Sequence, residues 1–587
     1  MAKKEVYNYV PDEFDGIQVN CCKNPACSNF GIPHLTKQEM AGRKKAPRGS
    51  RYGTSGSGRA KFINCRSCNE NIPIKSNHAI ADELYRFESY LETPIDGACQ
   101  NIACDNKLLD IKTNPSLYRK FGSTNNSKQR YQCKNCKKTF SLTPKASRQI
   151  YSYKNKMIFK LLMNYVPFRR ILEIADINFK TLYDKIDYIE NRCLKFLQYK
   201  EREFFGKNIL QMLYIGCDQQ YFTLNWTNTY EKRNVILRAI ASCDNKYRYC
   251  FGMHLNYDSG MDFKDAEINS EITKDYLHPP AYRTYARIWL ERDYWEALRS
   301  SHKKATSKRK QLIESQVREK YLEALERDDI EAPQDAFEDC QLPHVGAQVH
   351  SEYTLHGHFF FLRRILANVE KIRFFLDQDS GMRAACIGAF FDRIQDRTCD
   401  AFYISTNNEV SIHERKRIHQ KSAELIAATM SEQGLSSEYQ ARRYLLAKAI
   451  EESIPIGQWQ DRWVKFPYSH AGELNKMVCH LTNYNDYDFE HLVNLFDMAS
   501  THSTDSYFQL TRRRIRLVER PLKTMANSNQ WNGYSAYNPK ITQQLLNIFR
   551  AYYNFCLKGQ DGKTPAMRIG MAKAKIEVED VLYRGSY

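Results

Sequence analysis

Eight cysteines in the first quarter of the chain are the sequence feature that most restricts its fold. They form four pairs that alternate between C-x4-C and C-x2-C spacing: Cys22/Cys27, Cys65/Cys68, Cys99/Cys104 and Cys133/Cys136. The text of the first pair, Cys-Lys-Asn-Pro-Ala-Cys-Ser-Asn, returns 77 residues later as Cys-Gln-Asn-Ile-Ala-Cys-Asp-Asn. The spacing therefore predicts two copies of one small module.

Each module has the cysteines for one tetrahedral Zn2+ site. Two short Cys-to-Cys spacings bring four thiolates together, and four Cys ligands leave no open position, so both zinc ions would be structural. Disulfides are the alternative, but the N-terminal residues lack the apolar segment of a signal peptide, which favours a reducing compartment. We expect zinc ribbons within residues 1–80 and 81–145. Cys21, His34 and His78 are competing ligands.

The composition further restricts the class of protein to which the chain can belong. The chain of 587 residues is 42% hydrophobic and 13% aromatic, so it can bury sizeable cores and is not largely disordered. No stretch reaches the roughly 18 uncharged apolar residues of a membrane helix, so we expect no membrane association.

The net charge of +19 is concentrated near the N-terminus. Residues 1–200 hold 35 Lys and Arg against 18 Asp and Glu, whereas the rest is almost balanced. A local positive field suits nucleic acid, although a merely soluble basic surface is the alternative. Two basic loops without acids, 43–61 and 119–138, lie inside the modules. The residues expected to contact DNA there are Arg43, Lys44, Lys45, Lys128 and Arg130.

Residues 146–204 have helical periodicity. Two short helices, 168–177 and 179–186, surround a tight turn at Asn178, which is the pattern of a helix-turn-helix. The second helix carries Lys180, Thr181 and Lys185, which we expect to contact bases or phosphates. An ordinary helical linker is the alternative interpretation.

Beyond residue 205 the pattern changes to strands that end in acids. Asp218 follows the apolar run 213–217, and Asp377 and Asp379 follow the run 372–376, with Gly381 opening a helix. Glu519 lies in a basic, helix-like segment, where an ordinary salt bridge is the simpler explanation. If three of these carboxylates meet, they require divalent cations between them, and two Mg2+ or Mn2+ ions could then catalyse phosphoryl transfer.

These features together resemble bacterial insertion-sequence transposases of the DDE type. The C-terminal text, with Tyr552–Phe555 followed by the Thr-Pro-Ala-Met turn at 564–567, is similar to their tail, and 503–508 and 519–521 are similar to the segment before it. The resemblance implies a multidomain α+β chain with an RNase H-like mixed α/β core at 205–540. We expect helical insertions at about 262–342 and 405–500, and a C-terminal helix and tail at 541–587.

The resemblance also implies site residues. Asp218, Asp377 and Glu519 would hold the two catalytic ions, with Asp379 as rival to Asp377 and Asp505 as rival to Glu519. His502 and Arg512–Arg514 could contact the scissile phosphate, although structural or solvated roles are the alternative.

The function that follows is cleavage of the ends of a mobile element and their joining to target DNA. We expect double-stranded DNA as partner, a homodimer or larger assembly that pairs two ends, and a bacterial, nucleoid-associated cytoplasmic location. The alternatives are a non-catalytic zinc-ribbon and helix-turn-helix regulator, a domesticated scaffold, a nuclease that does not join strands, or an RNA-binding protein.

Overall fold

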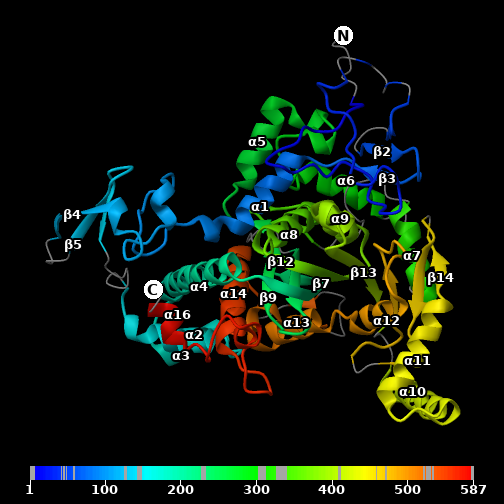
Figure 1. Ribbon diagram of the computed structural model, residues 1–587. Helices are drawn as coiled ribbons and strands as arrows, with labels where there is room; N and C mark the ends of the chain where they lie inside the picture. The colour runs from blue at the N-terminus through cyan, green and yellow to red at the C-terminus, as the bar shows by residue number, and fades with distance from the viewer. Residues whose placement is uncertain are drawn as a thin grey trace.

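The computed structural model shows a mixed α+β protein built around one large sheet (Figure 1). It describes residues 7–40, 43, 47, 49–56, 60–124, 129–141, 149–225, 233–301, 313–325, 340–407, 411–457, 459–469, 472–519, 522–523, 530–531 and 535–583. Within this part, no helix is long and apolar enough to cross a membrane.

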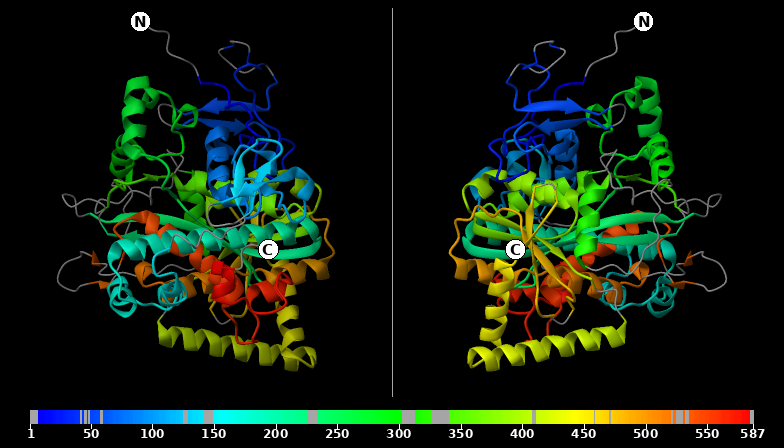
Figure 2. Two further views of the ribbon diagram at one scale, coloured as in Figure 1. Left: turned by 90° about the vertical axis from the view of Figure 1, so that its left-hand side faces the viewer. Right: turned by 90° about the vertical axis from the view of Figure 1, so that its right-hand side faces the viewer.

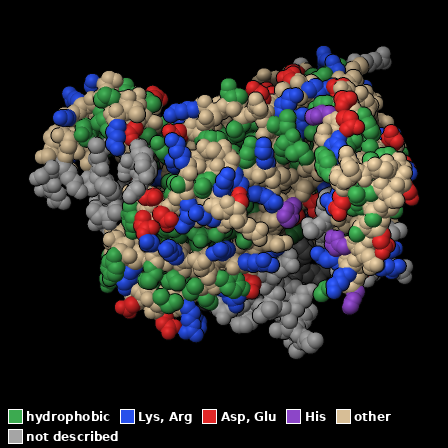
Figure 3. Space-filling view, turned by 60° about the horizontal axis from the view of Figure 1, so that its bottom comes forward, with side chains coloured by type: hydrophobic (Ala, Val, Ile, Leu, Met, Phe, Trp, Pro, Cys, Tyr) green, Lys and Arg blue, Asp and Glu red, His purple; other side chains and the backbone are tan. Residues whose placement is uncertain are grey.

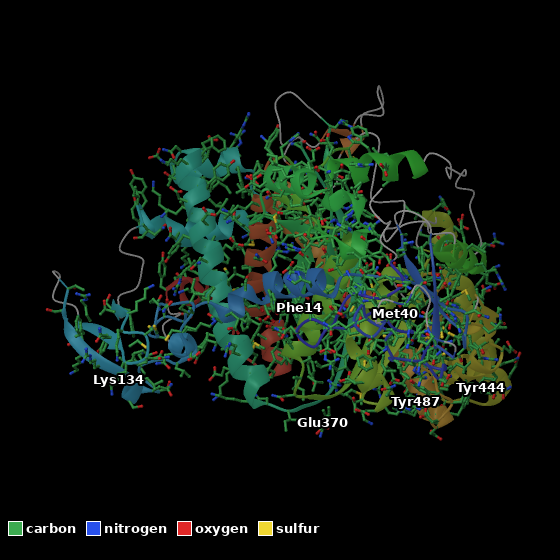
Figure 4. The ribbon with its side chains drawn as sticks, turned by 90° about the horizontal axis from the view of Figure 1, so that it is seen from above. Phe14, Met40, Lys134, Glu370, Tyr444 and Tyr487 are labelled. Carbon is green, nitrogen blue, oxygen red and sulfur yellow. The ribbon has the colours of Figure 1, made fainter. Side chains whose placement is uncertain are left out.

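The two cysteine modules are small three-stranded antiparallel sheets. The first contains β1 (Tyr52–Ser55), β2 (Phe62–Cys65) and β3 (Asn71–Pro73), and the second contains β4 (Tyr118–Ser123), β5 (Gln129–Cys133) and β6 (Thr139–Ser141). The first packs on the core, whereas the second projects sideways (Figure 1). Seen from above, Lys134 of the second module lies far from Met40 of the first (Figure 4).

Helix α1 (Asn77–Glu92) joins the first module to the core. It packs against α8 (Ser351–Ile365), and Gly357 permits the close approach, since a Cβ there would lie 2.7 Å from the Cβ of Glu83. The predicted domain boundary near residue 80 therefore falls inside a helix that both parts share.

The central sheet has eight strands in the order β14-β15-β16-β13-β12-β7-β8-β9. In the two side views it lies in the middle of the molecule, with helices around it (Figure 2). Strands β7 (Leu210–Leu224), β8 (Val235–Asp244) and β9 (Cys250–Leu255) form an antiparallel meander. Strand β12 (Val369–Asp377) runs parallel to β7, and β13 (Cys399–Ser405) runs parallel to β12. The helices α9 (Ser380–Gln395) and α13 (His502–Arg514) cover opposite faces (Figure 1).

The two insertions differ from each other. The first contains α5 (Phe263–Thr273), α6 (Glu291–Ser301) and α7 (Ile313–Leu325), and is helical as predicted. The second begins with α10 (Ile412–Gln433) and α11 (Glu438–Glu451) but continues with β14 (Ile454–Ile456), β15 (Asp461–Lys465) and β16 (Met477–His480), before α12 (Phe489–Met498). The expected helical insertion at 405–500 is helical over 412–433 and 438–451, but its three strands were not predicted, because strands of three to five residues leave too little periodicity to detect.

Helices α2 (Asn155–Leu162), α3 (Phe168–Ala175) and α4 (Phe179–Lys207) form the predicted helical region. Helix α4 continues for 29 residues, packs along α14 (Pro539–Ala551), and ends three residues before β7. The tail follows with a π-helical turn (Tyr552–Cys556), α15 (Pro565–Ile569) and α16 (Val578–Tyr583). Two small sheets consist of two-residue strands: β10 (Tyr257–Asp258) pairs with β11 (Ala347–Gln348), and β17 (Leu522–Lys523) pairs with β18 (Gln530–Trp531).

Candidate metal centres and acidic site

The structure brings together both predicted sets of four cysteines. Cys22, Cys27, Cys65 and Cys68 form one cluster, and Cys99, Cys104, Cys133 and Cys136 form the other. The closest Sγ–Sγ distances within the clusters run from 3.2 to 3.8 Å. These are too long for disulfides and close to the edge of a tetrahedron with Zn–S bonds of about 2.3 Å. Both clusters are therefore compatible with structural zinc.

The two clusters also share the groups around their sulfurs. Asn29 Nδ2 donates to Cys65 Sγ at 3.3 Å, and Asn106 Nδ2 donates to Cys133 Sγ at 3.3 Å. Tyr52 accepts from the backbone N–H of Cys22, and Tyr118 accepts in the same way from Cys99. Such outer hydrogen bonds orient metal ligands. The repeat noticed in the sequence thus extends to two tyrosines, whose equivalence the sequence analysis missed.

The competing ligands are not part of either cluster. Cys21 Sγ lies instead beside the Lys23 ammonium at 3.3 Å, and His78 Nδ1 lies 3.4 Å from a carboxylate oxygen of Asp82. One unpredicted acid, Glu70, lies against the first cluster and accepts from Cys22 Sγ at 3.0 Å. Burial and then the Glu70 charge raise the pKa of the Cys22 thiol, so a bound cation would have to offset both.

Four carboxyl groups line a separate cavity of about 710 Å3, and three of them come from the sheet and from the helix that covers it. Asp218 lies in the middle of β7, Asp377 is the last residue of β12, and Asp505 lies in the first turn of α13. The parallel register pairs Leu376 with Cys217, which sets Asp377 beside Asp218. Asp505 reaches the cavity from helix α13, which covers one face of the sheet.

Burial and neighbouring charges favour the protonated forms of two carboxyl groups in this cavity. Burial is the main cause that raises the pKa of Asp218 well above its ordinary value, and the negative charges of Asp377 and Asp505 raise it further. Burial also raises the pKa of Asp505, which hydrogen-bonds with the Asp218 carboxyl group. The three groups are more widely spaced than the cysteines: among the described residues, the sets with ligand atoms within 4.8 Å of one another are the two cysteine clusters. The acidic cavity is an open site with room for water and ligand.

The structure separates the rival acids. Asp379 caps α9, accepting from the Met382 N–H at 2.9 Å, so its carboxylate is occupied in holding a helix. Glu519 lines the cavity but forms an ion pair with Arg516, and it follows a short 3-10 turn rather than lying in a helix. The acid that contacts Asp218 is therefore Asp505, and the expected helical position of Glu519 is wrong because α13 ends at Arg514.

Arg514 donates to Asn164 Oδ1 at 2.7 Å, but two of the other expected phosphate contacts lie at the same cavity. His502 and Arg512 line it, as does Arg415 from α10, which the sequence analysis missed. Arg415 lies in an insertion whose place relative to the acids is set by tertiary packing alone, so no local signal identifies it.

The expected DNA contacts fall into three groups. At the start of α4, Lys180 is exposed and Thr181 is half-buried. In the cysteine modules, Arg43 is exposed and Arg130 donates to the Thr139 hydroxyl. Lys185 is instead 1% exposed, with its ammonium bonded to the carbonyls of Ile150 and Tyr151, and so does not lie on the surface. Lys44, Lys45 and Lys128 lie outside the described residues. Lysine and arginine side chains are scattered over the lower face of the molecule (Figure 3).

Comparison with family models, curated proteins and solved structures finds no match for this chain.

Proposed function

We propose that the chain is a DDE-type transposase, a metal-dependent enzyme that binds mobile-element ends, cuts them and joins them to target DNA. The observation that carries the proposal is the convergence of Asp218, Asp377 and Asp505 on one cavity, from two adjacent parallel strands and a covering helix. Asp377 and Asp505 lie 128 positions apart in the sequence. Their convergence on one cavity is therefore a result of the fold.

The sheet supports the proposal as well. The resemblance implies an RNase H-like core, a mixed sheet flanked by helices. The five strands β9-β8-β7-β12-β13 form a mixed sheet with helices on both faces, and the first two acids lie on its two central strands (Figure 1).

The residues of the cavity fit divalent cations because they are oxygen ligands whose mutual repulsion needs positive charge. When bound, Mg2+ or Mn2+ would activate the attacking water or 3′ hydroxyl and stabilise the charge on the phosphate. In this proposal Asp218 lies between the other two acids, Asp377 and Asp505 each hold one side of the site, and Asp505 takes the role first assigned to Glu519. Arg415, His502 and Arg512 lie where they can neutralise the DNA backbone.

The remaining parts supply DNA recognition. The exposed Lys180 at the start of α4 and the basic second module would hold the element ends, with at least two copies of the chain pairing two ends.

The test is a cleavage and joining assay on a DNA library with Mg2+ or Mn2+. We expect joined products from the wild type, none from Asp218→Asn or Asp505→Asn, and near-normal activity from Glu519→Gln, the control from the same cavity. Binding of element ends should persist in all variants. Tight binding without cleavage by the wild type would favour the regulator or scaffold, and cut ends without joined strands would favour a nuclease.

A further inference from the structure

Helix α7, from the first insertion, docks at the acidic end of β12. Val317 is fully buried, and its carbonyl accepts from Gln378 Nε2 at 3.1 Å. Gln378 directly follows Asp377. The inserted helix is therefore tied to the residue next to one of the three acids.

The helix α7 is also held by β15, a strand of the central sheet, and by the turn before that strand. Tyr321 donates to the Asp461 carboxylate at 2.5 Å and accepts from Trp463 Nε1 at 3.2 Å. Gly457 lies so close to the Tyr321 ring that a Cβ would approach it within 2.5 Å. These contacts from β15 and from the turn before it hold α7 in place.

This position brings the Lys320 ammonium to Asp377. Nζ lies 3.8 Å from Asp377 Oδ2 and donates to the carbonyl oxygen of Gln378 at 2.8 Å. The two side chains are 41% and 43% exposed, so water reaches the pair. Arg318, two residues away on α7, is exposed and gives a matched charge without this contact.

We infer that Lys320 is a positioning residue of the acidic site: its ammonium is the built-in counter-ion of Asp377 and sets how tightly this aspartate holds a divalent cation. The inference rests on the proposed function and gives the first insertion a role in it. Without a cation, the ammonium offsets part of the repulsion among the three acids. When a cation arrives, the same ammonium opposes it.

Two effects of the lysine on metal affinity have opposite signs. Orienting the carboxylate would strengthen binding, but an ion pair this exposed orients its partner weakly. Repulsion between the ammonium and a divalent ion next to Asp377 acts over a longer range. It is twice as large as the repulsion of a singly charged ion at the same distance. Repulsion is therefore the larger effect, and removing the charge should tighten metal binding.

The experiment measures Mn2+ binding to the full-length, zinc-loaded protein without DNA, by electron paramagnetic resonance of free Mn2+. The background is the binding that remains in Asp218→Asn. We expect Lys320→Gln, which keeps a donor for the Gln378 carbonyl, to lower the Kd by about five- to tenfold. Lys320→Arg should match the wild type, and Arg318→Gln should change the Kd by less than about twofold because its charge is farther from the acids.

A Lys320→Gln Kd equal to that of Arg318→Gln, or weaker than wild type, would overturn this inference alone. A matching fall in the metal concentration needed for half-maximal cleavage would support it further. Absence of any Asp218-dependent Mn2+ binding, in wild type and variants alike, would overturn the metal-dependent function and this inference together.

Discussion

A buried ion pair joins the first cysteine module to the core, and breaking it tests how firmly the two are coupled. Lys75, just before α1, pairs with Glu352 on α8, and their side chains are only 2% and 6% exposed. The neighbouring Ser76 N–H donates to Tyr353 at 3.2 Å. Removing one partner of such a pair leaves a buried charge and typically costs about 3–5 kcal/mol, whereas replacing both is often nearly neutral.

We therefore expect Lys75→Met to cost about 3–5 kcal/mol and the double variant Lys75→Met/Glu352→Gln to recover most of it. The assay is amide hydrogen exchange of α1 in the zinc-loaded protein. Protection there should fall by about two to three and a half orders of magnitude in the single variant, since 1.4 kcal/mol is a factor of ten. If the costs of the two single variants simply add in the double variant, the pair is not coupled and this reasoning fails.

Three further predictions concern other parts of the molecule. Cys133→Ser should remove one of two zinc ions per chain and unfold the second module, with little change in the melting temperature of the core, as mass spectrometry and calorimetry can check; a large loss of core stability would contradict it. Burial raises the pKa of Asp244 to about 6, so the folded protein keeps this proton to higher pH than the unfolded chain, and its contribution to stability is lost as pH rises from about 4 to 6. Urea unfolding of wild type against Asp244→Asn should show a difference of up to about 3 kcal/mol developing across that range, and parallel curves would refute it. Lys180→Ala should weaken binding to element ends and lower the salt dependence by about one charge, whereas an unchanged slope would remove α4 from the DNA interface.

Parts of the fold with strong local signals could be predicted from the sequence. The cysteine clusters follow from spacing alone, because two ligands on a tight turn need no knowledge of the distant fold. Strand β12 and helix α9 follow from the largely apolar run 372–376, the two acids after it and Gly381. The short strands β14–β16 could not, since each is held in the sheet by neighbours rather than by its own pattern.

The acidic site shows where spacing fails. Asp377 and Asp379 are two apart and look equivalent in the sequence, but the N-cap preference of aspartate before α9 could have assigned Asp379 to the helix. The choice between Asp505 and Glu519 depends on where α13 stops, and helix ends are the least predictable feature. Lys185 had a usable signal as well: it shares a helical face with Leu182 and Ile189, which are buried.

Helix α4 carries a geometric consequence for DNA processing. It begins at the proposed recognition turn and ends three residues before the strand that bears Asp218. At about 1.5 Å per residue, its 29 residues span roughly 43 Å, the length of about 13 base pairs. Helix α14 packs along it and holds it against the core. Under the proposed function, the length of α4 would therefore set the distance between the bound sequence and the cut. Adding or deleting one helical turn in α4 would then move the cleavage point along the DNA instead of abolishing cleavage.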